Sequence, residues 1–393
     1  MSVPLTQPVP TLLSVGAGTN SPVPFPVVLE LGERRLRLLD RARIYACGIT
    51  PYDVTHLGHA ATFLWVDTLA RVLRSAGVEV ELCRNVTDVD DVLDAAAARA
   101  GAPSDAFAAM QQFQFDQDMA RLGVRQPAHE PRAHRYVAHV VRLCGALLDA
   151  EAAYVRNGSV YYRGAATPQR AGLDEQQALA LAHEYAGRPD DPAKDSPLDV
   201  AVWQASSADE PAWQSPWGPG RPGWHAECAA MALSVFGSAV DVHAGGADLR
   251  FPHHAYQAAM TEAVSGVTPY ARGWLHAGVV TIEGRKMAKS AGNLVLVSEL
   301  LERWPAAAVR LLVIDRPWAQ SWDYSAEQVD AAAGRLERLY AAAGRPGDAA
   351  GANAEVSRLL LRNLDVPAAL AVAEQEGGAA ARLVVSVLGL GGA

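Results

Sequence analysis

The chain contains 393 residues, which is enough for two or three domains with a substantial core. Hydrophobic residues make up 50% of it and charged residues 20%, a balance that is typical of a folded protein and excludes a largely disordered chain. The net charge of −9, from 43 acidic against 34 basic residues, gives no general attraction to nucleic acid or to an anionic membrane.

The cysteines and the N-terminal stretch indicate a cytoplasmic protein. Four cysteines lie far apart and show no disulfide-framework spacing, so we expect reduced thiols. The N-terminal stretch lacks a basic segment followed by an apolar one, and no apolar run reaches the roughly 18 residues of a membrane span. We therefore expect neither export nor a membrane partner.

The first elements along the chain form one βαβ unit. The first 25 residues are rich in Pro, Gly and Ser and predict an extended arm. After them, "RIYACG" (43–48) predicts a buried strand, residues 61–76 a helix, and "VEVELCRNV" (78–86) a second strand. Such a unit is the building block of a parallel sheet that binds ligands at its strand ends.

The later elements alternate between helical and strand patterns. An Asn-Gly pair inside "AYVRNGSVYYRG" predicts a hairpin, and residues 170–195 read as an insertion that interrupts the sheet. The other expected elements are Ala-rich helical segments up to residue 123, helices over 133–152, from near His225 and from near His254, strands over 239–246 and 274–284, a loop over 285–293 and an amphipathic helical tail.

These elements suggest five regions. The predicted limits are an N-terminal extended arm over 1–40, a catalytic domain over 41–98 and 198–283, an inserted helical and hairpin region over 99–197, a loop and stem-contact-like region over 284–328, and a C-terminal helical domain over 329–393.

The turn "CGITPYDVTHLGHAAT" (47–62) carries more special residues than a strand-to-helix turn needs. An ordinary turn with His56 and His59 on the surface is one interpretation. The other is a nucleotide site, in which Gly58 lets the backbone approach a phosphate and two imidazoles three residues apart face the same oxygens at a helix N-terminus.

A second candidate is the loop "RKMAKSAGN" (285–293). Lysine-rich loops are commonly only solvated. Here Lys286 and Lys289 lie beside Ser290, Gly292 and Asn293, and two such cations could neutralise a triphosphate and follow its charge as pyrophosphate departs.

Together the two motifs resemble the signatures of class I aminoacyl-tRNA synthetases, "HIGH" as "HLGH" (56–59) and "KMSKS" as "KMAKS" (286–290). Within that class the chain is similar to cysteinyl-tRNA synthetase through "CGIT", "NVTDVDD", "GWHAEC", "GGADLRFPHH" and "SGVTPYARGWLHAG", which occur in the same order. The resemblance covers roughly residues 40 to 330 and implies a Rossmann-type α/β fold with an α/β insertion and a short C-terminal helical domain.

The resemblance also implies a zinc site. Its ligands carry over to Cys47, Cys228 and His253, while the family's fourth ligand, a Glu, is replaced by Gln257. Each residue taken alone could instead be a buried core residue. Three ligands leave an open position that a substrate thiolate can fill, and serine, whose hydroxyl is harder and less acidic, would bind poorly.

The same resemblance implies which residues act on cysteine and ATP. The phosphate charge would be offset by His56, His59, Lys286 and Lys289, with Mg²⁺ on the leaving pyrophosphate. The adenylate would lie against Cys47, Gly48, Ile49, Thr50, Thr62, Asn85, Val86, Thr87, Trp224, Gly246, Ala247, Asp248 and Val280. Trp224 could equally be a core aromatic residue, and Asp248 is a candidate for holding the ammonium group of cysteine.

A second family with the same catalytic core accounts better for the differences from the synthetase. The cysteine:glucosaminyl-inositol ligases of mycothiol biosynthesis resemble this chain in the "CGITPYDVTHLGHAATF" stretch, the missing Glu ligand, the Pro-rich arm and the short helical end. The implied reaction activates L-cysteine with ATP as cysteinyl-AMP and transfers it to the 2-amino group of glucosaminyl-inositol, an AMP-forming amide ligation.

The alternative is a cysteinyl-tRNA synthetase or a truncated paralogue. We expect no tRNA partner, because the tail shows no basic surface interleaved with aromatic residues, and we expect a monomer. The sequence also departs from the ligase pattern, with "EYAGRP" (184–189) for "ERGGDP", "AGGADLRFPHHA" for "GGGSDLIFPHHE", and Ala288 in the lysine loop.

Overall fold

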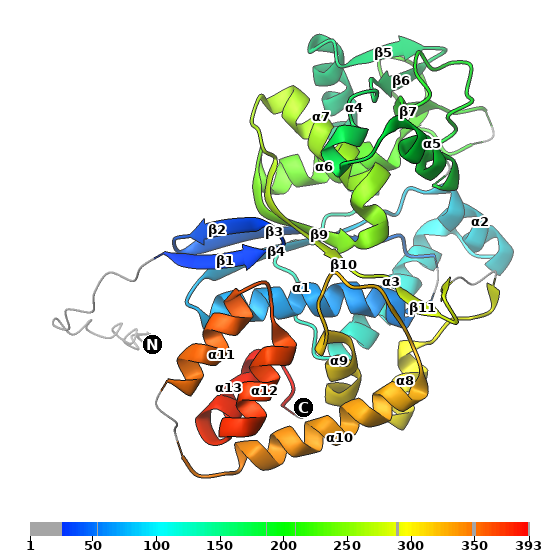
Figure 1. Ribbon diagram of the computed structural model, residues 1–393. Helices are drawn as coiled ribbons and strands as arrows, with labels where there is room; N and C mark the ends of the chain where they lie inside the picture. Colours follow the sequence, from blue (N-terminus) through cyan, green and yellow to red (C-terminus); the bar gives the residue numbers. More distant parts are fainter. Residues whose placement is uncertain are drawn as a thin grey trace, which may run out of the picture.

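A computed structural model of the chain describes residues 26–391 except for 53, 186, 209, 288–290 and 348–350 (Figure 1). The expected arm over residues 1–25 therefore lies outside the described residues. Residues 27–38, which were expected to continue that arm, form an antiparallel hairpin of β1 (Val27–Leu31) and β2 (Arg34–Leu38). This hairpin buries Leu29, Leu31, Leu36 and Leu38, the apolar positions of its alternating pattern.

The centre of the molecule is a four-stranded parallel sheet in the order β10-β9-β3-β4. Its strands are β3 (Arg41–Ile49), β4 (Glu79–Val86), β9 (Val240–Gly246) and β10 (Ala271–Ala277). The inner parts of β3, β4 and β9 are buried on both faces, as is typical of parallel sheets, whereas buried and less buried residues alternate in the edge strand β10. The Rossmann-type α/β fold expected from the sequence is confirmed.

Helix α1 (Leu57–Ser75) connects β3 to β4 and begins four residues before the expected start. The cause is a side-chain cap: the Nδ1 atom of His56 accepts a hydrogen bond from the backbone N–H of Gly58 at 3.1 Å. His is not among the residues that usually cap helices. The sequence pattern therefore predicted that the helix begins at the next clear apolar run.

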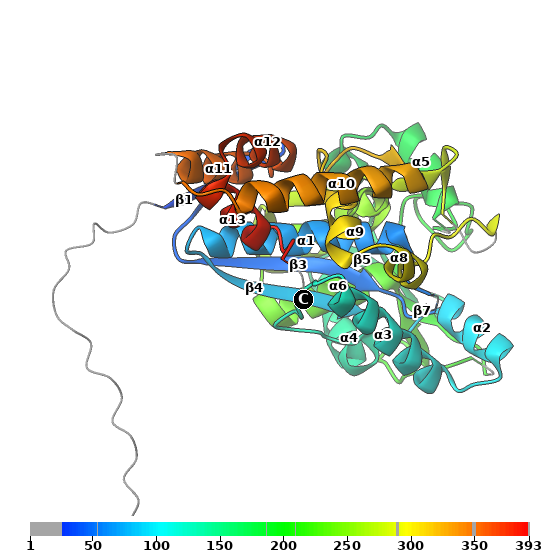
Figure 2. The ribbon, with the colours of Figure 1, turned by 90° about the horizontal axis from the view of Figure 1, so that it is seen from below.

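Helices cover both faces of the sheet (Figure 2). Helix α1 packs on one face together with α9 (Ala306–Ile314), while α6 (Trp224–Phe236) and α4 (Ala133–Asp149) lie on the other. The remaining helices before the lysine loop are α2 (Asp91–Ala100), α3 (Ser104–Arg121), η1 (Pro168–Ala171), α5 (Glu175–Glu184), η2 (Ala247–Leu249), η3 (Arg250–His254) and α7 (Ala255–Ser265).

A second, antiparallel sheet has the order β5-β6-β7-β8. The expected hairpin consists of β5 (Ala153–Arg156) and β6 (Ser159–Tyr162), with positive φ at Asn157 and Gly158 as an Asn-Gly turn requires. Strands β7 (Val200–Ala205) and β8 (Gly220–Pro222) extend this sheet beyond residue 197, the predicted end of the inserted region.

The strand predicted over residues 274–284 is wrong as one element. It divides into β10, which stays in the central sheet, and β11 (Val280–Ile282), which pairs with β12 (Arg285–Lys286) and β13 (Trp322–Asp323). The division falls at Gly278, where a Cβ atom would lie 2.1 Å from the carbonyl oxygen of Gln320. A distant segment therefore redirects the chain at a position whose sequence pattern is continuous.

The C-terminal helices join the same core as the central domain. They are α8 (Val297–Arg303), α10 (Ala326–Ala343), α11 (Ala352–Leu361), α12 (Val366–Glu376) and α13 (Gly378–Val387). Arg310 on α9 is fully buried and binds Asp67 of α1 at 2.5 Å, and its Nε donates to the carbonyl oxygen of Leu388 at 2.5 Å. Among the described residues, no helix combines the length and apolarity needed to cross a bilayer.

Candidate active site

A cleft of about 360 Å³ opens at the carboxyl ends of β3, β4 and β9, where parallel sheets of this type bind ligands. Gly58 lines it, as do sixteen of the residues that the sequence analysis proposed for catalysis, adenylate binding or metal binding. They are Cys47, Gly48, Ile49, Thr50, His56, His59, Thr62, Asn85, Thr87, Trp224, Cys228, Gly246, Asp248, His253, Val280 and Lys286.

Three of the predicted residues are not in the lining of this cleft. Val86 is buried and lies in β4 opposite Ile49, and Ala247 is half-buried in η2. Lys289 lies outside the described residues, together with Ala288 and Ser290 of the same loop.

The buried end of the cleft gathers two thiols and an imidazole. Cys47 ends the straight part of β3, Cys228 lies on α6, and His253 lies in η3. Their ligand atoms all lie within 4.8 Å of one another, and the three residues are 4%, 1% and 1% exposed. Cysteine sulfur and histidine nitrogen are the donors that zinc prefers, so the chemistry and the spacing of this set fit a zinc ion.

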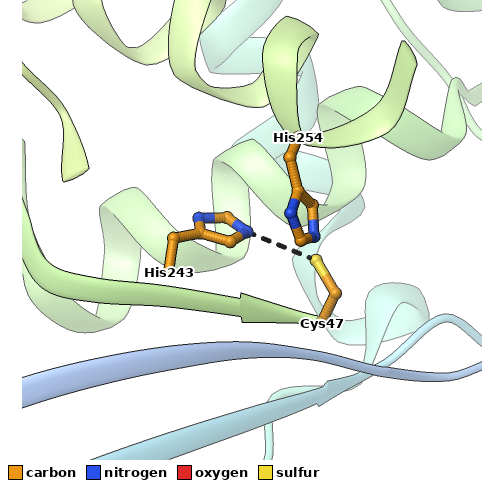
Figure 3. Close-up of side chains that lie close together, drawn as sticks. All are labelled: Cys47, His243 and His254. Carbon is orange, nitrogen blue, oxygen red and sulfur yellow. Dashed lines mark hydrogen bonds between the residues drawn. The ribbon is translucent and has the colours of Figure 1, made fainter. Parts of the chain in front are cut away.

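A second set of possible ligands shares Cys47 and was missed by the sequence reasoning. Cys47, His243 and His254 also lie within 4.8 Å of one another, and the Nε2 atom of His243 is 3.6 Å from the Cys47 sulfur (Figure 3). His243 belongs to "VHAGG" in β9, and His254 is the second histidine of "FPHH". The paired histidines were a signal for this set, but only the fold brings β9 beside them.

The two sulfurs differ in protonation. Burial acts to raise the pKa of the Cys47 thiol, but a hydrogen bond with Cys228 and the nearby imidazoles of His254 and His253 outweigh it and hold the pKa well below its usual value. Burial and the Cys47 sulfur raise the pKa of Cys228 well above its usual value. One sulfur of the pair is therefore ready to act as a thiolate ligand, and binding a cation would favour ionisation of the second.

Amide side chains support both sulfurs. Asn85 Nδ2 donates to the Cys228 sulfur at 3.2 Å, and Gln257 Nε2 donates to the Cys47 sulfur at 3.3 Å. Gln257 is fully buried and stands where the synthetase pattern has a Glu. Two neutral donors thus stabilise negative charge on sulfur without adding a carboxylate to the site.

The imidazole of His253 is held by its neighbours. Its ring stacks on Trp224 with the centroids 3.9 Å apart, and its Nδ1 lies 2.7 Å from Nδ1 of His225. Burial, together with nearby His253, lowers the pKa of His225 well below its usual value, so that ring is neutral. Trp224 is therefore not a remote core residue: it forms part of the cleft wall and fixes one of the candidate ligands.

The backbone of β3 approaches β4 closely at the cleft. Gly48 donates its N–H to Asn85 Oδ1 at 3.0 Å, and a Cβ atom at Gly48 would lie 1.6 Å from the carbonyl oxygen of Asn85. Next to it, the hydroxyls of Thr50 and Thr87 lie 2.7 Å apart. Only Gly fits at position 48 in this arrangement.

The mouth of the cleft carries the HLGH turn and the lysine loop. The rings of His56 and His59 lie 3.9 Å apart at the N-terminus of α1, where backbone N–H groups favour an anion. Lys286 Nζ lies 2.5 Å from Asp248 Oδ2, and its side chain is 53% exposed. Partial burial acts to lower the pKa of Lys286, but the Asp248 carboxylate outweighs it and raises the pKa above its usual value, so this lysine is a cation.

The cleft also contains residues to which the sequence analysis gave no role. Tyr185, which ends α5, reaches the cleft beside Lys286, whose Nζ lies 5.8 Å from the centre of its ring. The other such lining residues are Tyr52, Phe63, Leu249, Gly278, Val279 and Met287.

Comparison with known families agrees with this geometry. Residues 37–334 match the family described as the catalytic domain of class I (C) tRNA synthetases. The chain is 43% identical over 375 residues to the L-cysteine:1D-myo-inositol 2-amino-2-deoxy-alpha-D-glucopyranoside ligase of Mycobacterium ulcerans, covering 90% of each protein. It is 43% identical over 355 residues to the enzyme of the same name from Parafrankia sp., covering 89% of this chain and 80% of that enzyme.

Solved structures support the fold. Mycobacterium tuberculosis methionyl-tRNA synthetase in complex with methionyl-adenylate aligns with a TM-score of 0.59 at 18% identity, covering 89% of this chain and 82% of that chain. A ternary complex of Agrobacterium radiobacter K84 leucyl-tRNA synthetase aligns with the same TM-score at 12% identity. At these identities the likeness extends to the fold alone.

Proposed function

This chain belongs to the class I tRNA-synthetase catalytic family and, within it, to the L-cysteine:1D-myo-inositol 2-amino-2-deoxy-alpha-D-glucopyranoside ligases, and on this premise we propose that it couples L-cysteine to the amine of glucosaminyl-inositol at the expense of ATP. The observation that carries the proposal is that one cleft joins the buried sulfur and imidazole cluster to the HLGH turn and Lys286. A thiol-bearing substrate and a nucleotide triphosphate can therefore be bound side by side.

The first step is formation of cysteinyl-AMP. The cysteine carboxylate attacks the α-phosphorus of ATP, a new O–P bond forms, and the bond to pyrophosphate breaks. His56, His59 and Lys286 offset the charge on the phosphates, together with Mg²⁺ accompanying ATP and with Lys289 of the lysine loop, so this end of the cleft acts by positioning and electrostatics.

The second step forms the amide. The unprotonated amine attacks the activated carbonyl, the C–O bond to AMP breaks, and the nitrogen loses a proton to solvent or to a base. Asp248 faces the cleft and has the charge to hold the ammonium group of cysteine during both steps. Thr50, Asn85 and Trp224 line the cleft between the two ends and would contact the body of the adenylate.

We further propose that Cys47, Cys228 and His253 hold a zinc ion, because these donors and their spacing fit that metal. When bound, zinc would supply a soft Lewis acid that favours a thiolate over a hydroxyl and so separates cysteine from serine. Gln257 is neutral, so it adds no anionic fourth ligand to the site. His225 and Trp224 hold the His253 ring in place.

The experiment is an ATP–pyrophosphate exchange assay with the purified chain, followed by product analysis. We expect exchange with cysteine and little with serine, and release of AMP with an amide product when glucosaminyl-inositol is added. Release of ADP, or charging of tRNA in place of the sugar amine, would overturn the proposal. The tRNA-charging alternative has less support, because the near relatives over about 90% of the chain carry the ligase name.

A further inference from the structure

A second, smaller cavity of about 140 Å³ lies beside the cleft, between α5 and the η2–η3 segment. We call it the annex, and its lining includes Leu173, Leu181, Tyr185, Asp248, Arg250 and Phe251. None of the motifs quoted in the sequence analysis assigns a function to it. The inserted region supplies one wall and the segment after β9 supplies the other.

The annex adjoins the cleft at two shared residues. Tyr185 and Asp248 line both spaces. Lys286 meets both of them at this junction, with its Nζ 2.5 Å from Asp248 Oδ2 and 5.8 Å from the centre of the Tyr185 ring. A molecule bound across this junction, with one part in the annex and another in the cleft, would lie beside the proposed position of the cysteine ammonium group.

The lining combines apolar faces with one donor group and one acceptor group. Tyr185, Leu181 and Phe251 offer aromatic and aliphatic surface. Asp248 offers carboxylate oxygens, and the exposed guanidinium of Arg250, whose Nη2 donates to the carbonyl oxygen of Ala171 at 2.9 Å, has further N–H groups. A cyclic polyol has the complementary chemistry, because its C–H faces are apolar and its rim carries hydroxyls that both donate and accept.

The reaction fixes which part of the acceptor can enter the annex. The amine-bearing ring must stay at the junction, because its nitrogen attacks a carbonyl that lies in the cleft. We propose that the annex binds the inositol ring of the acceptor, with Leu181 and Phe251 against its faces and Arg250 at its hydroxyls. This inference rests on the proposed function and makes the annex a specificity site for the second substrate.

The test fills the annex from α5 with Leu181→Trp and compares two amine acceptors, glucosaminyl-inositol and glucosamine. We expect kcat/KM for glucosaminyl-inositol to fall by about tenfold or more, because a blocked pocket rejects the ring that should occupy it. The value for glucosamine, which lacks that ring, should change little, so the preference between the two acceptors collapses. Arg250→Leu, at an exposed position, should lower kcat/KM for glucosaminyl-inositol relative to that for glucosamine by about tenfold, because hydrogen bonds to the inositol hydroxyls are lost.

The matched control is Ala180→Trp, which adds the same side chain one residue away on the exposed side of α5. It should keep the acceptor preference of the unaltered chain. If both annex variants keep that preference while exchange and amide formation proceed, the annex proposal is wrong and the proposed function stands. If the unaltered chain shows no cysteine-dependent exchange, the proposed function itself fails.

Discussion

The two ends of the cleft are built in opposite ways. At the buried end, Cys47, Cys228 and His253 are at most 4% exposed, and each is fixed by a further side chain. At the mouth, Lys286 is 53% exposed and held by one carboxylate. This difference fits the proposed function. Recognition of sulfur needs a rigid set of ligands shielded from water, whereas a departing pyrophosphate needs cations that can follow moving charge.

The largest effect is expected when one of the proposed zinc ligands is removed from the buried end of the cleft. Cys228→Ala should lower the zinc content and reduce cysteine-dependent exchange by more than about 100-fold. Mutating a residue that only hydrogen-bonds to a metal ligand can already lower metal affinity or activity by up to about 100-fold. Metal analysis and the exchange assay measure the two effects. Cys144→Ala is the matched control, because Cys144 is an equally buried cysteine outside the cleft. Equal losses in both variants would contradict a special role for Cys228.

A substitution at the mouth of the cleft should lower the rate of exchange without weakening the binding of cysteine. Lys286→Met removes one cation and should lower kcat for exchange by about 100-fold, the cost of removing one electrostatic group from a reacting centre. The KM for cysteine should change far less. Arg285→Met is the control, since Arg285 is the adjacent exposed cation and pairs with Glu283. A large rise in the cysteine KM with kcat intact would place Lys286 in recognition instead.

A third substitution, with a smaller expected effect, tests how the buried end of the cleft stabilises sulfur. Gln257→Glu removes the N–H donor to the Cys47 sulfur and adds a carboxylate in its place. We expect the KM for cysteine to rise by about tenfold, because a charge-assisted hydrogen bond to sulfur is lost and an anion now competes with the incoming thiolate. Gln257→Met, which removes the donor without adding charge, separates the two causes. A lower KM in the Glu variant would contradict this explanation.

Local patterns were enough to predict the central strands, and the family resemblance supplied most of the residues that line the cleft. The strands at 43–48 and 78–86 were correctly expected, and the residues proposed as zinc ligands, Cys47, Cys228 and His253, come together from three elements as the family resemblance implied. The strands are predictable because each depends on a short run of residues, and the three separate motifs could be assigned to one site only through the family resemblance.

The missed features depend on contacts between distant segments. Strand β10 ends at Gly278 because the segment around Gln320 packs against it, which no pattern near residue 278 reveals. His243 joins Cys47 only because β9 lies beside β3 in the sheet. Tyr185 reaches the cleft only because the inserted region folds back over η3. Neither periodicity nor motif spacing contains this information.

The buried contact of Arg310 has a consequence for how such a chain can be shortened. Its guanidinium joins the helix that carries the HLGH turn to the final turn of α13, through Asp67 and the carbonyl oxygen of Leu388. Cutting the chain before residue 388 would leave Arg310 paired with Asp67 but without one of its acceptors in the core, at a cost of about 1–3 kcal/mol, as for an unsatisfied buried donor. The carboxyl-terminal helices therefore serve as scaffolding for the helix that carries the HLGH turn, and a shortened chain would need another acceptor for Arg310.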